Sequence, residues 1–206
     1  MANILEMNEK HLSPPTSFDV SIYGDDVSVS ATKSQKRLRI FYKGLNRNRT
    51  FISDEFANQL IESLPYTPVK GIFNKDSVDY EDHGADNCEG KIYGIVPENP
   101  NFAWEKHLDV DGVEREYACC DVYLFTSLYP EAKLIQGKSQ SMEIYRKTMK
   151  GEWRDDIDGK PYYHFLKGEF IGLQVLGDEV EPCFEGAAFF SLLETFNNKL
   201  AEIENI

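Results

Sequence analysis

Two segments of the chain carry side chains that could do acid–base or nucleophilic chemistry. In the first, Asp79-Tyr80-Glu81-Asp82-His83-Gly84-Ala85-Asp86, one histidine stands among four carboxylates. Neighbouring carboxylates stabilise an imidazolium, so His83 could act as a general base once a substrate displaces water. Two other interpretations stay open, namely a solvated acidic loop with an incidental histidine and a calcium loop. The ligand spacing, however, does not match the EF-hand pattern.

The second segment is Gly137-Lys138-Ser139-Gln140-Ser141-Met142-Glu143-Ile144-Tyr145. On a strand, Ser139, Ser141 and Glu143 face one way, and Met142 and Ile144 face the other. A serine on a rigid strand is a nucleophile when a base lies within hydrogen-bond reach. The alternative is the polar face of a half-exposed strand.

A third candidate is His164, because its strand is expected to pair with the serine strand through a hairpin at Asp158-Gly159. It then lies either close to the serine face or in a structural hydrogen bond. His11 and His107 have no neighbours in the sequence that suggest chemistry.

Composition limits the class of protein. The chain has 206 residues with 41% hydrophobic residues, which indicates one folded domain of ordinary size and not a disordered segment. Its formal net charge of −13 opposes binding to phosphate backbones and anionic lipid, so we expect no nucleic-acid or membrane partner. No secretory signal or membrane-spanning apolar run is visible.

The four cysteines show no CxxC spacing and no metal-binding pattern. We therefore expect reduced thiols in a reducing cytoplasm, with no metal and no cofactor.

The apolar pattern predicts strands separated by turns and a few helices. The strands are expected at 18–23, 27–31, 37–42, 69–73, 92–96, 117–125, 138–147, 162–166 and 170–176. A helix follows the N-cap Ser53 and ends before Pro65, a short one runs from Pro130 to Ile135, and Asp111-Gly112 forms a hairpin turn.

These elements predict an α+β fold centred on a small, mostly antiparallel sheet or β-barrel. Residues 1–17 form an N-terminal arm, 18–187 form the domain, and 188–206 form an amphipathic C-terminal helix for docking or oligomerisation.

The order of motifs resembles the prohead (capsid maturation) serine proteases of tailed phages, over roughly residues 37–190. The front half of the resemblance rests on Asn46-Arg47-Asn48-Arg49-Thr50-Phe51-Ile52, a helix, Pro68-Val69-Lys70-Gly71, Asp82-His83-Gly84 and 90–96. The back half rests on 121–125, on 135–143 with the serine strand, on 170–176, on Pro182 and on Gly186-Ala187.

The resemblance implies the herpesvirus assemblin fold, a small β-barrel ringed by helices, and a Ser–His endopeptidase. In that family's arrangement His83 matches the general base and Ser141 the nucleophile, with Ser139 as the runner-up. The closing strand lacks the acid that relatives often carry, so the third member is His164 or, less well matched, Glu143. Backbone N–H groups near the Gly137 turn would hold the oxyanion.

The implied substrates and partners are the phage scaffold and major capsid protein, inside the immature head in the bacterial host cytoplasm. A homodimer or higher homo-oligomer is also possible in this arrangement. One alternative is a catalytically inactive scaffold or minor head protein of the same fold. Another is a metal-dependent hydrolase built on the acidic loop around His83.

Overall fold

A computed structural model describes residues 27–83, 89–155 and 159–191 of the chain. Within these residues the protein is mostly β, with one α-helix and one 3₁₀ helix, so helices do not ring the sheet as expected. The helices are α2 (Asp54–Glu62) and η1 (Pro130–Ile135). The strands are β1 (Val27–Ser30), β2 (Lys33–Tyr42), β3 (Gly44–Leu45), β4 (Thr50–Ile52), β5 (Pro68–Gly71), β6 (Phe73–Asn74), β7 (Asp79–Tyr80), β8 (Lys91–Ile95), β9 (Ala103–Leu108), β10 (Glu114–Leu124), β11 (Gln140–Ile144), β12 (Lys150–Asp155), β13 (Pro161–Lys167), β14 (Phe170–Val175) and β15 (Phe189–Phe190).

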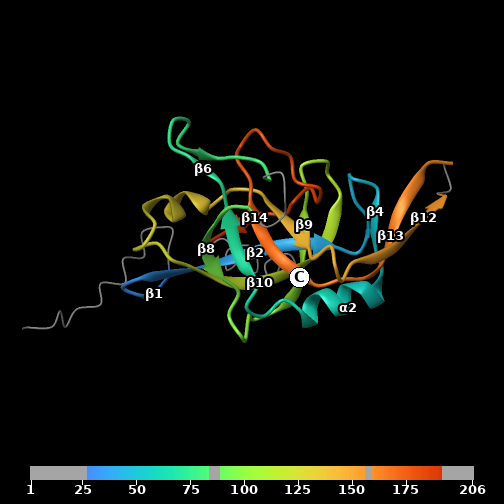
Figure 1. The fold of residues 1–206 in the computed structure, drawn as a ribbon, viewed down its shortest axis with the longest axis horizontal. Coiled ribbons are helices and arrows are strands. Elements are labelled where there is room, and N and C mark those ends of the chain that lie inside the picture. Colours follow the sequence, from blue (N-terminus) through green and yellow to red (C-terminus); the bar gives the residue numbers. More distant parts are fainter. Residues whose placement is uncertain (1–26, 84–88, 156–158, 192–206) are drawn as a thin grey trace, which may run out of the picture.

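The largest sheet has nine strands and curls into a nearly closed barrel (Figure 1). Its order is β1-β2-β10-β8-β5-β14-β11, with β15 added to β2 and β9 to β10. A bridge between Ser139 and Ala188 links the start of β11 to the chain entering β15, which itself pairs with β2. The two ends of the sheet therefore almost meet.

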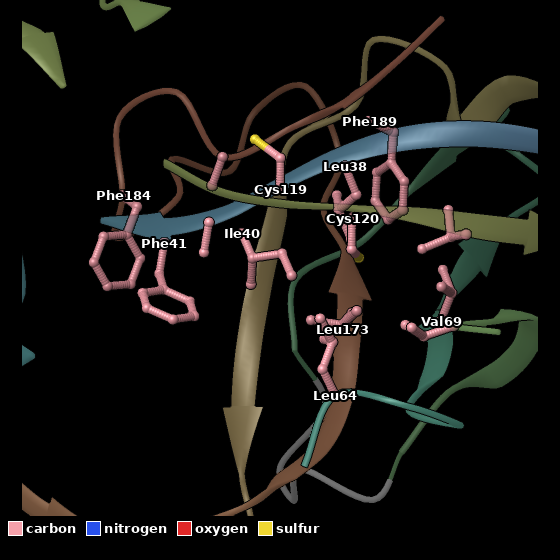
Figure 2. Close-up of a cluster of buried hydrophobic side chains, with 14 of the residues drawn as sticks. Leu38, Ile40, Phe41, Leu64, Val69, Cys119, Cys120, Leu173, Phe184 and Phe189 are labelled. Carbon is pink, nitrogen blue, oxygen red and sulfur yellow. The ribbon is translucent and has the colours of Figure 1, made fainter. Parts of the chain in front are cut away.

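The hydrophobic core fills this barrel (Figure 2). Leu38 and Ile40 of β2, Val69 of β5 and Leu173 of β14 are completely buried. Cys120 of β10 joins them as a small apolar residue. Successive side chains of a strand point to opposite faces of the sheet, so the residues between these core residues project to the face away from the core.

A second sheet, of order β12-β13-β4-β3, extends from the barrel. In Figure 1 the β12–β13 hairpin projects away from the main body. Helix α2 packs on β13, and its Phe56 ring stacks on Phe165 at 5.1 Å. As predicted, Ser53 caps this helix by accepting a hydrogen bond from the Phe56 N–H.

Several predicted elements are confirmed, including the hairpin at Asp111-Gly112, where Gly112 has a φ of 77°. The hairpin expected between the serine strand and the His164 strand is wrong. Strand β13 pairs with β12, whereas the serine strand β11 pairs with β14.

At the C-terminus, the helix predicted from residue 188 is also wrong at its start. Phe189 and Phe190 form β15, because their rings are buried where the barrel closes on β2. The remainder of that predicted helix, 192–206, lies outside the described residues, as do the whole of the predicted arm and the predicted strand 18–23.

Candidate functional site

The outer face of three neighbouring strands carries a row of buried polar side chains. The strand pairing aligns Lys70 of β5 with Gln174 of β14, and Gln174 with Ser141 of β11. One step along, Glu143 of β11 lies opposite Gly172 of β14. Lys70, Gln174, Ser141 and Glu143 are only 4%, 0%, 8% and 2% exposed. Polar groups buried this deeply need partners, so the row is an energetically demanding arrangement.

Glu143 is the centre of a charged cluster on this face. Its Oε2 lies 2.5 Å from Lys70 Nζ, in an ion pair without hydrogen-bond alignment. Its Oε1 lies 3.5 Å from His83 Nδ1. The carboxylate therefore bridges a buried ammonium and the imidazole of the acidic loop.

Gly172 makes the ion pair possible. A Cβ on Gly172 would lie 2.3 Å from Lys70 Cε and 2.6 Å from Glu143 Oε2. Lys70 and Glu143 come from strands on either side of β14 and meet over Gly172. Any other residue there would push the pair apart.

Ser141 lies on the same strand face as Glu143, two residues earlier. Its hydroxyl hydrogen-bonds the thiol of Cys183, which follows β14 in the chain. Burial raises the pKa of Cys183 to about 11, and the hydrogen bond from Ser141 opposes that rise. The Ser141 hydroxyl is therefore hydrogen-bonded to a neutral thiol.

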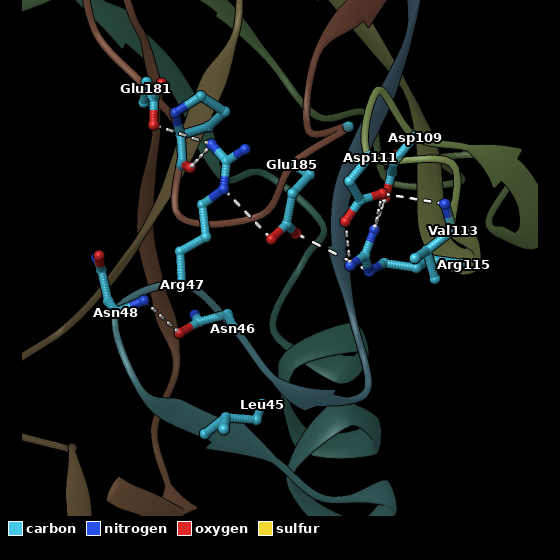
Figure 3. A network of polar contacts seen from close by, with 12 residues as sticks. Leu45, Asn46, Arg47, Asn48, Asp109, Asp111, Val113, Arg115, Glu181 and Glu185 are labelled. Atoms are coloured by element: carbon cyan, nitrogen blue, oxygen red, sulfur yellow. Dashed lines mark hydrogen bonds and ion pairs between the residues drawn. The ribbon is translucent and has the colours of Figure 1, made fainter. Parts of the chain in front are cut away.

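Arg47 holds the Cys183 segment in place (Figure 3). The Arg47 backbone N–H donates to the Cys183 carbonyl at 3.2 Å. The Arg47 guanidinium lies 3.3 Å from carboxylate oxygens of both Glu181 and Glu185. Glu185 also faces Arg115 of β10 at 4.0 Å. The segment is thus tied to the loop between β3 and β4 and to β10 of the barrel.

The loop that carries Arg47 is itself a tight turn, also visible in Figure 3. The Asn46 side-chain oxygen accepts hydrogen bonds from the N–H groups of Asn48 and Thr50. This fixes the turn that the sequence predicted only as a polar, basic loop.

The structure brings His83 to the strand of Ser141 and leaves His164 elsewhere. His164 lies on β13 in the second sheet, where its ring packs against Phe51 at 5.2 Å. Because β13 does not pair with β11, the route by which His164 was expected to approach the serines is absent. Ser139, the alternative nucleophile, lies at the bridge to Ala188.

The N–H groups near Gly137 that were expected to hold the oxyanion already donate hydrogen bonds within the protein. The N–H groups of Gly137, Lys138 and Gln140 donate to the carbonyls of Phe189, Ile135 and Ala187. The bonds from Gly137 and Gln140 close the barrel, and the bond from Lys138 forms the turn after η1, so none of the three N–H groups is available to a substrate.

Sequence reasoning missed Lys70, Gln174 and Cys183 as parts of the site. Lys70 and Gln174 each interrupt an otherwise apolar strand, which is the one signal that could have marked them. Their meeting depends on strand order, which the sequence pattern does not contain.

No three His, Cys, Asp or Glu side chains gather as a metal site within 27–83, 89–155 and 159–191. Over the same ranges, no helix is long and apolar enough to cross a bilayer.

Comparison with known proteins gives one match. No curated protein and no solved structure matches the chain. The YonD N-terminal domain family matches residues 31–205, which include the whole buried polar row and the His83 loop. The chain therefore belongs to the YonD N-terminal domain family.

Proposed function

We propose that this protein is a serine endopeptidase that cleaves scaffold or capsid precursors during maturation of a phage head. The observation that carries the proposal is the contact between His83 Nδ1 and Glu143 Oε1, on the strand face of Ser141. The phage association of the YonD family name supports the setting. The nearly closed barrel is compatible with an assemblin-like fold.

The spacing of the three residues suits a serine triad. Residues i and i+2 of a strand lie about 6.7 Å apart on one face. An imidazole with a hydrogen bond at each nitrogen spans a similar distance between a carboxylate and a hydroxyl. With Glu143 at Nδ1, Ser141 would use Nε2, which lies 4.0 Å from Asp82 Oδ1 and would have to turn from that carboxylate to the serine.

The reaction follows from these roles. His83 Nε2 takes the Ser141 proton as Oγ bonds to the peptide carbonyl carbon. The C–N bond then breaks, and the leaving amine takes the proton from His83. Water hydrolyses the acyl-enzyme with His83 again as base. Glu143 orients the ring and stabilises the imidazolium, so it replaces His164 as the third member of the proposed triad.

Lys70 acts through Glu143 and is a positioning residue. Its ammonium offsets the cost of burying the carboxylate and fixes Oε2, which leaves Oε1 aimed at His83. The Ser141 hydroxyl is hydrogen-bonded to the Cys183 thiol, so a substrate carbonyl that approaches Ser141 would have to displace that thiol. Cleavage therefore requires the Cys183 segment to move aside.

Co-expression with the scaffold and major capsid proteins of the same phage tests the proposal. We expect trimmed products on gels and by intact mass, and we expect Ser141→Ala and His83→Ala to abolish them. Ser77→Ala, at an exposed loop serine, is the matched control and should trim normally.

Reaction with an alkyl fluorophosphonate gives a second readout that needs no substrate. The Ser141 oxygen should bond to phosphorus as fluoride leaves and His83 takes the proton. Trimming and labelling that persist in both Ser141→Ala and Ser139→Ala would overturn the serine mechanism. A wild-type chain that neither trims nor labels would favour a structural head protein.

A further inference from the structure

Gln174 is the most poorly satisfied buried side chain on the polar face. It is fully buried near the end of β14, and neither its amide nitrogen nor its amide oxygen has a hydrogen-bond partner among the described residues. Folding must desolvate both atoms without compensation. A fold retains such a residue at a cost in stability, which is a pattern found where a side chain serves function.

The pairing of the strands places this amide beside the proposed nucleophile. Gln174 is the register partner of Ser141, and directly paired residues project to the same face with Cβ atoms about 5 Å apart. On its other side Gln174 is aligned with Lys70, whose ammonium pairs with Glu143. In the sheet, Gln174 therefore lies between Ser141 and Lys70, one residue pair along from Gly172, over which the Lys70 ammonium meets Glu143.

A serine endopeptidase needs donors for the oxygen that becomes negative in the transition state. The backbone N–H groups of Gly137 and Gln140 are already used in closing the barrel, and that of Lys138 is used in the turn after η1. The unpartnered amide of Gln174 is the side-chain donor that the described structure keeps next to Ser141.

We propose that the Gln174 side-chain amide is the oxyanion donor for reaction at Ser141. This inference rests on the proposed function. When a substrate carbonyl displaces Cys183 from Ser141, its oxygen lies beside the Gln174 NH₂ group. The amide then donates a hydrogen bond that strengthens as Oγ bonds to carbon and the carbonyl electron pair moves to oxygen. Because the site is buried, a fixed amide dipole there stabilises the negative oxygen more strongly than the same dipole would in water.

The test compares two buried glutamines. Gln174→Met keeps the length of the side chain and removes both unpartnered polar atoms. Gln140→Met is the matched control, because Gln140 is equally buried and lacks a partner only at its amide oxygen, while its amide nitrogen donates to the Ile40 carbonyl on the other face of β11. Gln174→Leu is a second variant, in case methionine packs poorly.

The readouts are the rate constant for fluorophosphonate labelling of Ser141, the rate of trimming of co-expressed scaffold protein, and the urea midpoint of unfolding. We expect Gln174→Met to slow labelling and trimming about 10²–10³-fold, as for loss of one oxyanion donor. Its urea midpoint should rise. Gln140→Met should show the opposite pattern, with a lower midpoint and a labelling rate per folded molecule within about threefold of wild type.

Two results would overturn the inference: labelling by both Gln174 variants within threefold of wild type, or a lower urea midpoint for both. If Ser141→Ala stops the reaction while the Gln174 variants react normally, only the oxyanion assignment fails. If Ser141→Ala reacts like wild type, the proposed function fails as well.

Discussion

His83 Nδ1 lies 3.5 Å from Glu143 Oε1, which joins a loop after β7 to the strand β11. The two residues are distant in the chain and belong to different parts of the barrel surface. The opposite nitrogen of the ring, Nε2, lies 4.0 Å from Asp82 Oδ1. The imidazole is thus held between the exposed carboxylate of Asp82 and the buried carboxylate of Glu143, which shares its strand face with Ser141.

We expect Glu143→Gln to slow fluorophosphonate labelling of Ser141 about 10²–10⁴-fold. The amide keeps the shape of the carboxylate but cannot stabilise an imidazolium. The rate should be measured per folded molecule, because Lys70 loses its ion-pair partner in this variant. Glu169→Gln, at an exposed glutamate on the turn before β14, should label like wild type. Equal rates for both variants would remove Glu143 from the mechanism.

A second prediction concerns Lys70. Lys70→Met should lower the free energy of unfolding by about 3–5 kcal/mol, because it leaves a buried carboxylate without its cation. The double variant Lys70→Glu/Glu143→Lys should recover much of that stability, since the buried pair is restored. It should nevertheless label slowly, because an ammonium now faces His83. Urea unfolding measures the stability, and the labelling rate measures the reactivity of Ser141. If the double variant labels as fast as wild type, Lys70 has only a structural role.

The sequence predicted the elements of this fold that depend on local signals. The helix after Ser53 and the turn at Asp111-Gly112 each carry their own cap or turn chemistry. The outer face of β11 also followed from simple alternation, which placed Ser141 and Glu143 together.

The partners of the strands could not be predicted in the same way. The alternating pattern from 138 to 147 fits a hairpin with β13 as well as it fits pairing with β14. In the observed order, Lys70 and Glu143 meet over Gly172, and these three residues come from three separate strands. The role of Gly172 can be recognised only when the order of the three strands is known, so the sequence did not predict the buried ion pair.

The third prediction is a pH effect at the β9–β10 turn. Hydrogen bonds from the Arg115 guanidinium and from the Val113 N–H lower the pKa of Asp111 from 3.8 to about 2. A carboxyl whose pKa is lower in the folded state stabilises the fold above its unfolded pKa and loses that effect as the pH falls through its folded pKa. Asp111→Asn should therefore reduce the urea midpoint at pH 6 and have little effect near pH 2. Because Asp111 is exposed to solvent, the difference should be small and should shrink in high salt.

The last prediction concerns the reactivity of the Cys183 thiol, which is hydrogen-bonded to Ser141. With a pKa of about 11, only about one Cys183 thiol in a thousand is ionised at pH 8. Iodoacetamide should therefore alkylate Cys183 in the folded protein about 10²-fold more slowly than in urea, as measured by peptide mass spectrometry. The rate should rise about tenfold per pH unit from pH 8 to pH 10.

Arg47→Ala removes the side-chain contacts to Glu181 and Glu185, so it should loosen the Cys183 segment and speed alkylation of Cys183 at pH 8. Lys91→Ala, which breaks an ion pair with Glu131 elsewhere on the surface, should leave the rate unchanged. Rapid alkylation of the wild-type protein at pH 8 would contradict a buried thiol on Ser141, because only an exposed or ionised sulfur reacts at that rate.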